Sequence, residues 1–251
     1  NRREHKVNGG AGLISARLTV EGPIKKDTSS FIFSGRRTYI DVLTRPFAKG
    51  TSAEGSGYYF YDLNAKINHR FSEKDEVYLS GYFGRDVFSF KNTDAGFGTS
   101  IPWGNSTASL RWNHLFNDQL FLNMNVSYTD YNFAFEGEQE EFAFGFNSGI
   151  EDWSYKSTLN YYPNSRHEIK CGVEYVFHEF MPTDFFARNG DTPIEVGVSE
   201  VTYSHESSAF IESDFEVNEF LKIYSGLRYS DFRHVGPFTR YSPDYTDLDS
   251  T

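Results

Sequence analysis

Hydrophobic and polar residues alternate with a period of two along much of this chain. From Tyr59 to Phe71, every second residue is apolar or aromatic apart from His69. The intervening positions from Asp62 to Arg70 carry only amides and charges. Successive side chains of a β-strand point to opposite faces, whereas a helix would distribute these residues around its circumference. The pattern therefore predicts a strand with one apolar and one polar face.

The same alternation recurs about ten times, at intervals of about 24 residues. The expected strands cover residues 14–21, 31–36, 58–71, 77–83, 108–116, 120–129, 153–161, 169–178, 209–215 and 221–230. Short polar turns are expected at 22–28, 72–75, 117–119, 163–167 and 216–219, and longer links at 41–57, 91–104, 181–200 and from 234 onward. The link at 136–141 is a short exception, which strands that extend further would explain. Antiparallel strands with short turns at one end and long loops at the other are typical of an outer-membrane barrel.

Aromatic residues mark the edge of the apolar faces beside the short turns. These residues are Phe71, Phe116, Tyr161, Phe215 and Phe220. Aromatic rings prefer a membrane–water interface, although the rim of a soluble β-sandwich core would also accommodate them. Shifting the third strand by one residue would expose Lys66 and Arg70 to hydrocarbon, at a cost of roughly 2–4 kcal/mol each near the midplane. The fold class predicted is all-β: an antiparallel transmembrane β-barrel.

Composition narrows the function classes further. The 251 residues include 25 Phe, 17 Tyr and 3 Trp, yet only 38% of the chain is hydrophobic. The formal net charge of −11 argues against nucleic acid as a partner. The single Cys171 excludes an internal disulfide and a cysteine-based metal cluster. The longest apolar run, Tyr58–Tyr61, is far shorter than a transmembrane helix requires.

Several segments resemble one family of membrane proteins. The segment at 7–24, VNGGAGLISARLTVEGPI, resembles the first barrel strand of Bacteroidetes-type TonB-dependent outer-membrane transporters. The segment at 29–39, SSFIFSGRRTY, resembles their second strand. The segments YYPN at 161–164 and LKIYSGLRY at 221–229 resemble later turns and strands, which are common to many barrels. The resemblance spans nearly the whole chain.

This resemblance implies a 22-stranded barrel, a plug domain inside it and a short segment that engages TonB. We expect residues 1–251 to form the N-terminal part of the barrel, with the plug and the C-terminal barrel strands outside this chain. The implied function is import of a nutrient across the outer membrane of a Gram-negative cell, with no chemistry performed by the barrel. The implied partners are TonB, the plug, outer-membrane lipid and a surface lipoprotein that covers the ligand.

Two sets of residues are candidates for function. Aromatic side chains in the long links can stack on or enclose a ligand: Phe47, Phe97, Trp103, Phe185, Phe186 and Phe238. Charged residues on the polar face are placed to hold the plug, although a solvated channel wall would look the same: Arg17, Glu21, Arg36, Asp62, Lys66, Arg70, Arg111 and Lys156. We expect no cofactor and no resident metal.

Two other functions remain open from the sequence. A complete ten-stranded outer-membrane enzyme would place His178, His205 and His234 together at its rim, with an aspartate to activate water. The other alternative is a soluble or surface β-protein that binds a ligand and does not insert into a membrane. Acidic residues at 136–141 and 244–249 lack the full spacing of a calcium loop, and no His-Glu-x-x-His motif occurs.

Overall fold

The computed structural model describes residues 3–194 and 200–236. Their elements are β1 (Lys6–Ala11), β2 (Ser15–Lys25), β3 (Ser29–Thr38), α1 (Ile40–Ala48), β4 (Gly57–Arg70), β5 (Asp75–Asn92), β6 (Phe97–Asn117), β7 (Leu120–Gln139), β8 (Phe142–Asn164), β9 (His167–Asn189), β10 (Thr192–Ile194), β11 (Thr202–Asn218) and β12 (Leu221–Val235). The described chain is thus almost entirely β, as its alternation predicts.

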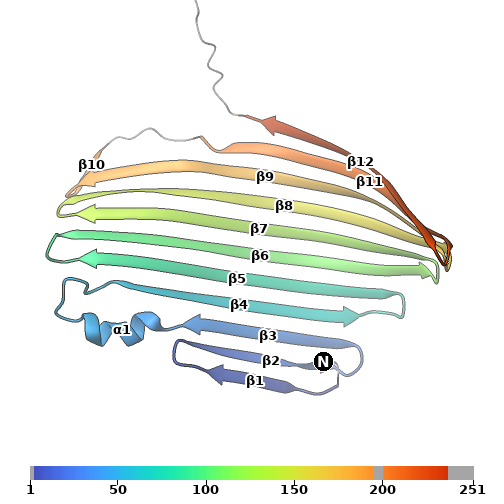
Figure 1. The fold of residues 1–251 in the computed structure, drawn as a ribbon, viewed down its shortest axis with the longest axis horizontal. Coiled ribbons are helices and arrows are strands. Elements are labelled where there is room, and N and C mark those ends of the chain that lie inside the picture. The colour runs from blue at the N-terminus through green and yellow to red at the C-terminus, as the bar shows by residue number, and fades with distance from the viewer. Residues whose placement is uncertain (1–2, 195–199, 237–251) are drawn as a thin grey trace, which may run out of the picture.

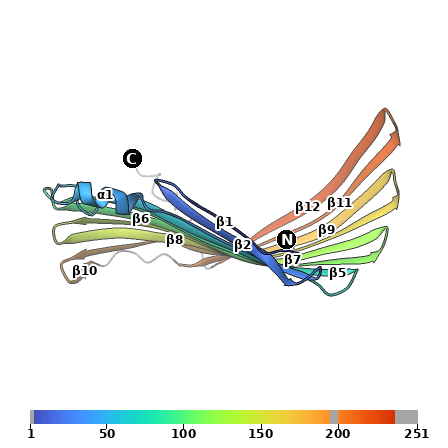
Figure 2. The ribbon, with the colours of Figure 1, turned by 90° about the horizontal axis from the view of Figure 1, so that it is seen from below.

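One antiparallel sheet contains all twelve strands of the described residues. Each strand pairs with the strands before and after it in sequence, except that the short β10 pairs only with β9, so β11 takes its place beside β9. Figure 1 shows this meander with its long strands side by side, and Figure 2 shows how strongly the sheet twists. The sheet is not closed, and β1 and β12 form its two edges.

The pairing register places like residues in rows across the sheet. One row holds Phe33, Ala65, Gly81, Ala108, Tyr128, Trp153 and Phe177 in direct succession. The adjacent row, on the other side of the sheet, holds Lys66, Ser80, Ser109, Ser127 and Ser154. We call the side of the first row the apolar face and the side of the second row the polar face. Side chains of a strand alternate between faces, so this register keeps the two sets apart.

The structure extends several strands beyond the predicted bounds. The segment 91–104 is not a loop, because β5 runs to Asn92 and β6 begins at Phe97. Likewise β9 continues to Asn189, through much of the segment expected to be a link at 181–200. Alternation of apolar and polar residues in these segments is weaker than between Tyr59 and Phe71, yet the backbone continues to pair with its neighbours, with one register shift between β8 and β9 at Asn147–Gly149. The turn at 136–141 is short, as expected, since β7 ends at Gln139.

Three elements escape the sequence pattern. Strand β1 pairs with β2 through residues such as Gly9 and Gly10, which have no side chain to reveal a periodicity. Helix α1 lies within the link at 41–57 and contains Pro46. Strand β10 has three residues, too few for a period of two to be visible. The described sheet therefore has twelve strands where the alternation shows about ten.

No hydrophobic side chain is buried among the described residues. The buried side chains of this part of the chain are instead polar: Ser29, Ser30, Thr38, Thr158, Asn160, Ser204 and Ser208. Central residues of the apolar face remain open, with Leu79 at 52% and Leu110 at 49% exposure. A folded protein in water normally buries such residues, so an external apolar phase or partner has to cover this face.

Aromatic side chains bound the apolar face at both ends. At the short-turn end lie Phe71, Phe116, Tyr161 and Phe215, as the sequence predicts. At the other end lie Tyr61, Phe83, Tyr128, Trp153 and Phe177. On β8 the two belts are bridged by the nine residues from Trp153 to Tyr161, a length that crosses a bilayer when strands tilt. None of the described helices has the length and apolar character needed to cross a membrane.

Candidate functional site

A row of aromatic rings covers the polar face where β6 to β9 extend beyond the belts. We call it the aromatic wall, and its members are Trp103, Phe133, Phe135, Phe144, Phe146 and Phe185. The ring centroids of Phe133 and Phe146 lie 5.9 Å apart. The rings of Phe135 and Phe146 are stacked at 5.7 Å, and Phe185 lies 5.8 Å from Phe146. Rings at these distances attract one another and present one continuous apolar surface.

Trp103 connects this wall to the strands nearer the N-terminus. It pairs with Phe133 in the register of β6 and β7. Its ring stacks on Tyr58 of β4, with centroids 6.5 Å apart. The Tyr58 hydroxyl donates a hydrogen bond to Asp86 Oδ1 at 2.8 Å, which fixes the ring in place. The aromatic wall therefore extends over several strands held in register by backbone pairing.

The structure separates the aromatic residues predicted from the sequence. Trp103 and Phe185 belong to the aromatic wall, and Phe97 lies on the same face with its ring 6.4 Å from Phe90. Phe186 follows Phe185 on the same strand and therefore lies on the opposite face. These residues stand on strands, not in loops.

Of the remaining two predicted aromatics, one lies away from the wall and the other is not described. Phe47 stands on α1 with 85% of its side chain exposed. Phe238 lies outside the described residues. Ligand contact by any of these side chains stays a prediction.

Sequence reasoning missed four members of the wall. Phe133 and Phe135 alternate with Ala134, and Phe144 and Phe146 alternate with Gly145. This is the same period of two that identifies the other strands, with small residues at the second face. The link expected at 136–141 hides this period, because the strands on both sides of it extend further than the alternation predicts.

All eight charged candidates lie on the polar face, as the alternation predicts: Arg17, Glu21, Arg36, Asp62, Lys66, Arg70, Arg111 and Lys156. Arg36 Nε donates to Asp62 Oδ2 at 2.7 Å, and its guanidinium lies 4.8 Å from the centre of the Phe60 ring. Lys66 and Arg111 both lie over the ring of Tyr78, at 5.1 and 4.3 Å. These cations are positioned by neighbours on adjacent strands.

Further along the sheet the charges form a small network. The Glu174 carboxylate forms ion pairs with Lys156 at 3.6 Å and with Arg228 at 3.2 Å. Arg228 also donates to the hydroxyl of Ser208 at 2.7 Å. These groups are partly exposed, so each pair contributes at most about 1 kcal/mol to stability. Their alignment makes this part of the polar face a charged, hydrated wall; contact with a plug stays a prediction.

The three rim histidines do not form one site. His178 Nδ1 lies 2.7 Å from Asp152 Oδ1, and its Nε2 lies 3.8 Å from Glu206. His234 shares the polar face with His178, since both pair with Ser204. His205 lies on the apolar face and hydrogen-bonds Tyr175 at 2.6 Å. No group of three potential metal ligands is arranged to hold an ion among the described residues.

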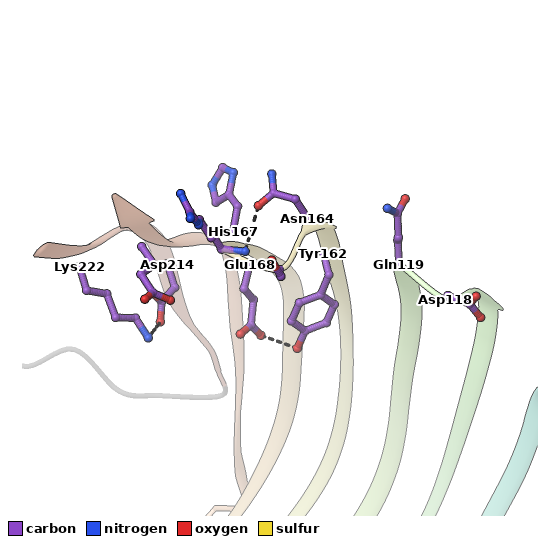
Figure 3. Close-up of a pocket in the computed structure, with 11 residues that line it drawn as sticks. Asp118, Gln119, Tyr162, Asn164, His167, Glu168, Asp214 and Lys222 are labelled. Carbon is purple, nitrogen blue, oxygen red and sulfur yellow. Dashed lines mark hydrogen bonds and ion pairs between the residues drawn. The ribbon is translucent and has the colours of Figure 1, made fainter. Parts of the chain in front are cut away.

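A polar cavity of about 400 Å³ lies on the polar face at the short-turn end. Figure 3 shows Tyr162 and Glu168 side by side, with Lys222 reaching Asp214. The Tyr162 hydroxyl donates to Glu168 at 2.8 Å, and Lys222 pairs with Asp214 at 2.8 Å. The hydrogen bond to Glu168 raises the pKa of Tyr162. The polar face thus ends in paired acid and base groups at one end and in the aromatic wall toward the other.

Neither protein-family models nor curated proteins match this sequence. Solved structures do match its fold. The pyoverdine outer membrane receptor FpvA of Pseudomonas aeruginosa aligns with a TM-score of 0.69 and 11% identity, over 94% of this chain and 42% of the receptor. The siderophore receptor PirA of Acinetobacter baumannii aligns at 0.61 and 15%, over 91% and 38%. The copper transporter OprC aligns at 0.65 and 12%, over 93% and 38%.

These alignments establish the fold. The described sheet has the architecture of a portion of an outer-membrane receptor barrel. The chain spans about two fifths of the length of each of these three structures.

Proposed function

We propose that this chain forms part of the barrel of a TonB-dependent transporter in the outer membrane of a Gram-negative cell, as the segments at 7–24 and 29–39 suggest. The observation that carries the proposal is a long-stranded sheet of receptor-barrel fold in which no hydrophobic side chain of residues 3–194 and 200–236 is buried. The apolar face then contacts lipid between the two aromatic belts. The polar face becomes the lumen, and the open edges β1 and β12 pair with barrel strands contributed outside this sheet.

In this arrangement the end of the sheet opposite the short turns faces the outside of the cell. The aromatic wall stands above the membrane on the lumen side, where Trp103 and Phe146 offer flat apolar surface to an arriving ligand. The charged residues below it, such as Arg36 and Lys156, face the plug. TonB acts on that plug from the periplasm, and a surface lipoprotein would cover the outer end. The barrel supplies position and charge and performs no chemical step.

Import is tested by uptake in cells that lack the full gene. Cells carrying the wild-type gene should accumulate one of a panel of radiolabelled ferric siderophores or copper, and cells without it should not. Combined Phe133→Ala and Phe146→Ala changes should reduce uptake about tenfold or more, because stacked rings in a ligand site contribute more than their area alone. Phe186→Ala, on the opposite face, is the matched control and should leave uptake unchanged. An equal loss of uptake in the control would contradict a role of the aromatic wall in ligand binding.

A mass measurement addresses the barrel itself. The native protein extracted from outer membranes should be several times heavier than the 28.8 kDa of this chain, with its peptides inside the longer sequence. A native mass near 28.8 kDa would contradict the transporter proposal and favour a self-contained barrel.

A further inference from the structure

Two arginines stand on the apolar face at the upper edge of the belt. Arg37 of β3 and Arg85 of β5 both pair with Tyr61 of β4, one from each side. On this face of β3 the residue before Arg37 is Gly35, and on this face of β5 the residue before Arg85 is Phe83. Each arginine therefore lies one position outward from the apolar residues of its own strand. A cation in this position costs little only near the interface, where its long side chain can reach water or an anion.

The surface beside these arginines is hollowed. A shallow groove of about 670 Å³ lies along β2, β3 and β4, and its lining includes Leu18, Gly35, Leu63 and Arg37. A second hollow of about 330 Å³ lies beyond Tyr61, and its lining includes Phe83, Arg85 and Asp130. Leu18, Gly35, Leu63 and Phe83 form one row of the sheet. This apolar row lies next to the row that holds the two arginines.

Neighbouring groups hold the arginines in different ways. Arg37 lies 5.5 Å from the centre of the Tyr59 ring and 3.6 Å from Asp41 Oδ2, while its side chain remains 56% exposed. Asp130 lines the same hollow as Arg85, but Arg85 forms no ion pair with it or with another described side chain. The Arg85 guanidinium can therefore bind an outside anion, and the ring beside Arg37 orients the Arg37 guanidinium.

The rest of this rim carries the opposite charge. On β7, β8 and β9 the apolar belt ends at Tyr128, Trp153 and Phe177, and the next outward residues are Asp130, Glu151 and Glu179. An anion that reaches the upper edge of the belt is repelled by these carboxylates and attracted to β3–β5. The charge pattern selects both the sign of the ligand and its place.

We propose that the apolar face at β2–β5 binds an outer-leaflet lipid with a phosphate headgroup. Its acyl chain lies in the groove over Gly35, and its phosphate lies between Arg37 and Arg85, which flank Tyr61. Guanidinium groups suit phosphate because their planar donors bind its oxygens in pairs. The proposal rests on the membrane orientation proposed above.

The test uses the full-length protein in detergent and native mass spectrometry. The probes are phosphorylated lipid A, the same lipid without its phosphates, and inorganic phosphate alone. Wild-type protein should retain the phosphorylated lipid about tenfold better than the dephosphorylated one, as expected for charge-assisted hydrogen bonds. The double variant Arg37→Gln, Arg85→Gln should lose this preference. Arg111→Gln, on the polar face of β6 and outside both hollows, should keep it.

A second variant tests the groove without changing charge. A Cβ atom at Gly35 lies 3.1 Å from the flexible end of Leu63, so Gly35→Val should fill the groove and weaken retention of both lipids. Circular dichroism and thermal unfolding confirm that each variant is folded. If Gly35→Val does not fold, the double variant Arg37→Gln, Arg85→Gln alone tests the lipid site.

Three results would overturn the lipid site: equal retention of both lipids by the wild type, an unchanged preference in the double variant, or an equal loss in Arg111→Gln. Binding of free phosphate as tight as that of the lipid would also overturn it. Uptake is measured separately. Protein that imports its ligand but shows no lipid preference contradicts this site alone, whereas protein that prefers the lipid but imports nothing contradicts the transport proposal alone.

Discussion

At the scale of single residues, the face that a side chain takes decides what it contacts. Val126 and Ser127 are neighbours on β7, yet Val126 lies in the middle of the apolar belt and Ser127 on the polar face. Val126 is 41% exposed in this sheet. If lipid covers the apolar face, the same substitution at these two positions has very different consequences.

An arginine scan of this pair measures that difference. Val126→Arg should destabilise the protein in lipid vesicles by roughly 2–4 kcal/mol, because it places a charge near the midplane. Ser127→Arg, the matched control, should change the free energy of unfolding by about 0.5 kcal/mol or less. Denaturant titration in vesicles gives both values. Equal tolerance at the two positions would show that the apolar face does not meet hydrocarbon.

Asp75 provides a test of the contacts at the short-turn end. The carboxylate lies 2.7 Å from His114 Nδ1 and accepts hydrogen bonds from Ser72 at 2.8 Å and Trp112 at 3.1 Å. These contacts join the start of β5 to β6 and to the turn before it.

Asp75→Asn should therefore be less stable than the wild type, because an amide cannot accept all of these hydrogen bonds. Denaturant titration in vesicles at neutral pH compares the two proteins. Equal stability of the two would contradict the assigned hydrogen bonds.

At the scale of elements, the alternation identifies the strands in the segments that lie between the two aromatic belts. Between Tyr59 and Phe71 the two faces meet different environments, so the alternation is strong and β4 is predicted closely. Beyond the belts both faces meet water, and β6 and β9 continue with little contrast between their faces. The aromatic wall stands in this extension, which explains why most of its members were missed.

The close pairing of β8, β9 and β11 predicts a sensitive glycine. A Cβ atom at Gly172 would lie 2.7 Å from ring atoms of Phe210 and 2.7 Å from the Ser157 carbonyl oxygen. Gly172→Ala should cost roughly 1–3 kcal/mol through overpacking. At Gly81 the nearest atom to an added Cβ is 3.9 Å away, so Gly81→Ala should change stability by about 0.5 kcal/mol or less. Unfolding free energies measured in vesicles compare the two, and equal effects would contradict the pairing register.

At the scale of the whole molecule, the sheet lacks the core that a water-soluble protein needs. Between the two aromatic belts, apolar residues cover one face, and charged residues such as Lys66, Arg111 and Lys156 lie on the other. The period of two predicts this division and the antiparallel order from the sequence alone. It does not predict β1, whose glycines hide the pattern, or how the edges of an open sheet are completed, because edge pairing depends on residues beyond the sheet.

The central claim is that the apolar face contacts lipid and the polar face contacts water. Spin labels attached one at a time to cysteines at positions 153 to 161 of β8 test it in the full-length protein in lipid bilayers, after Cys171→Ala removes the native thiol. We expect labels at Trp153, Tyr155, Ser157, Leu159 and Tyr161 to collide with dissolved oxygen, and labels at the four positions between them to collide with a water-soluble nickel complex. Water accessibility at all nine positions, with no alternation, would contradict the account.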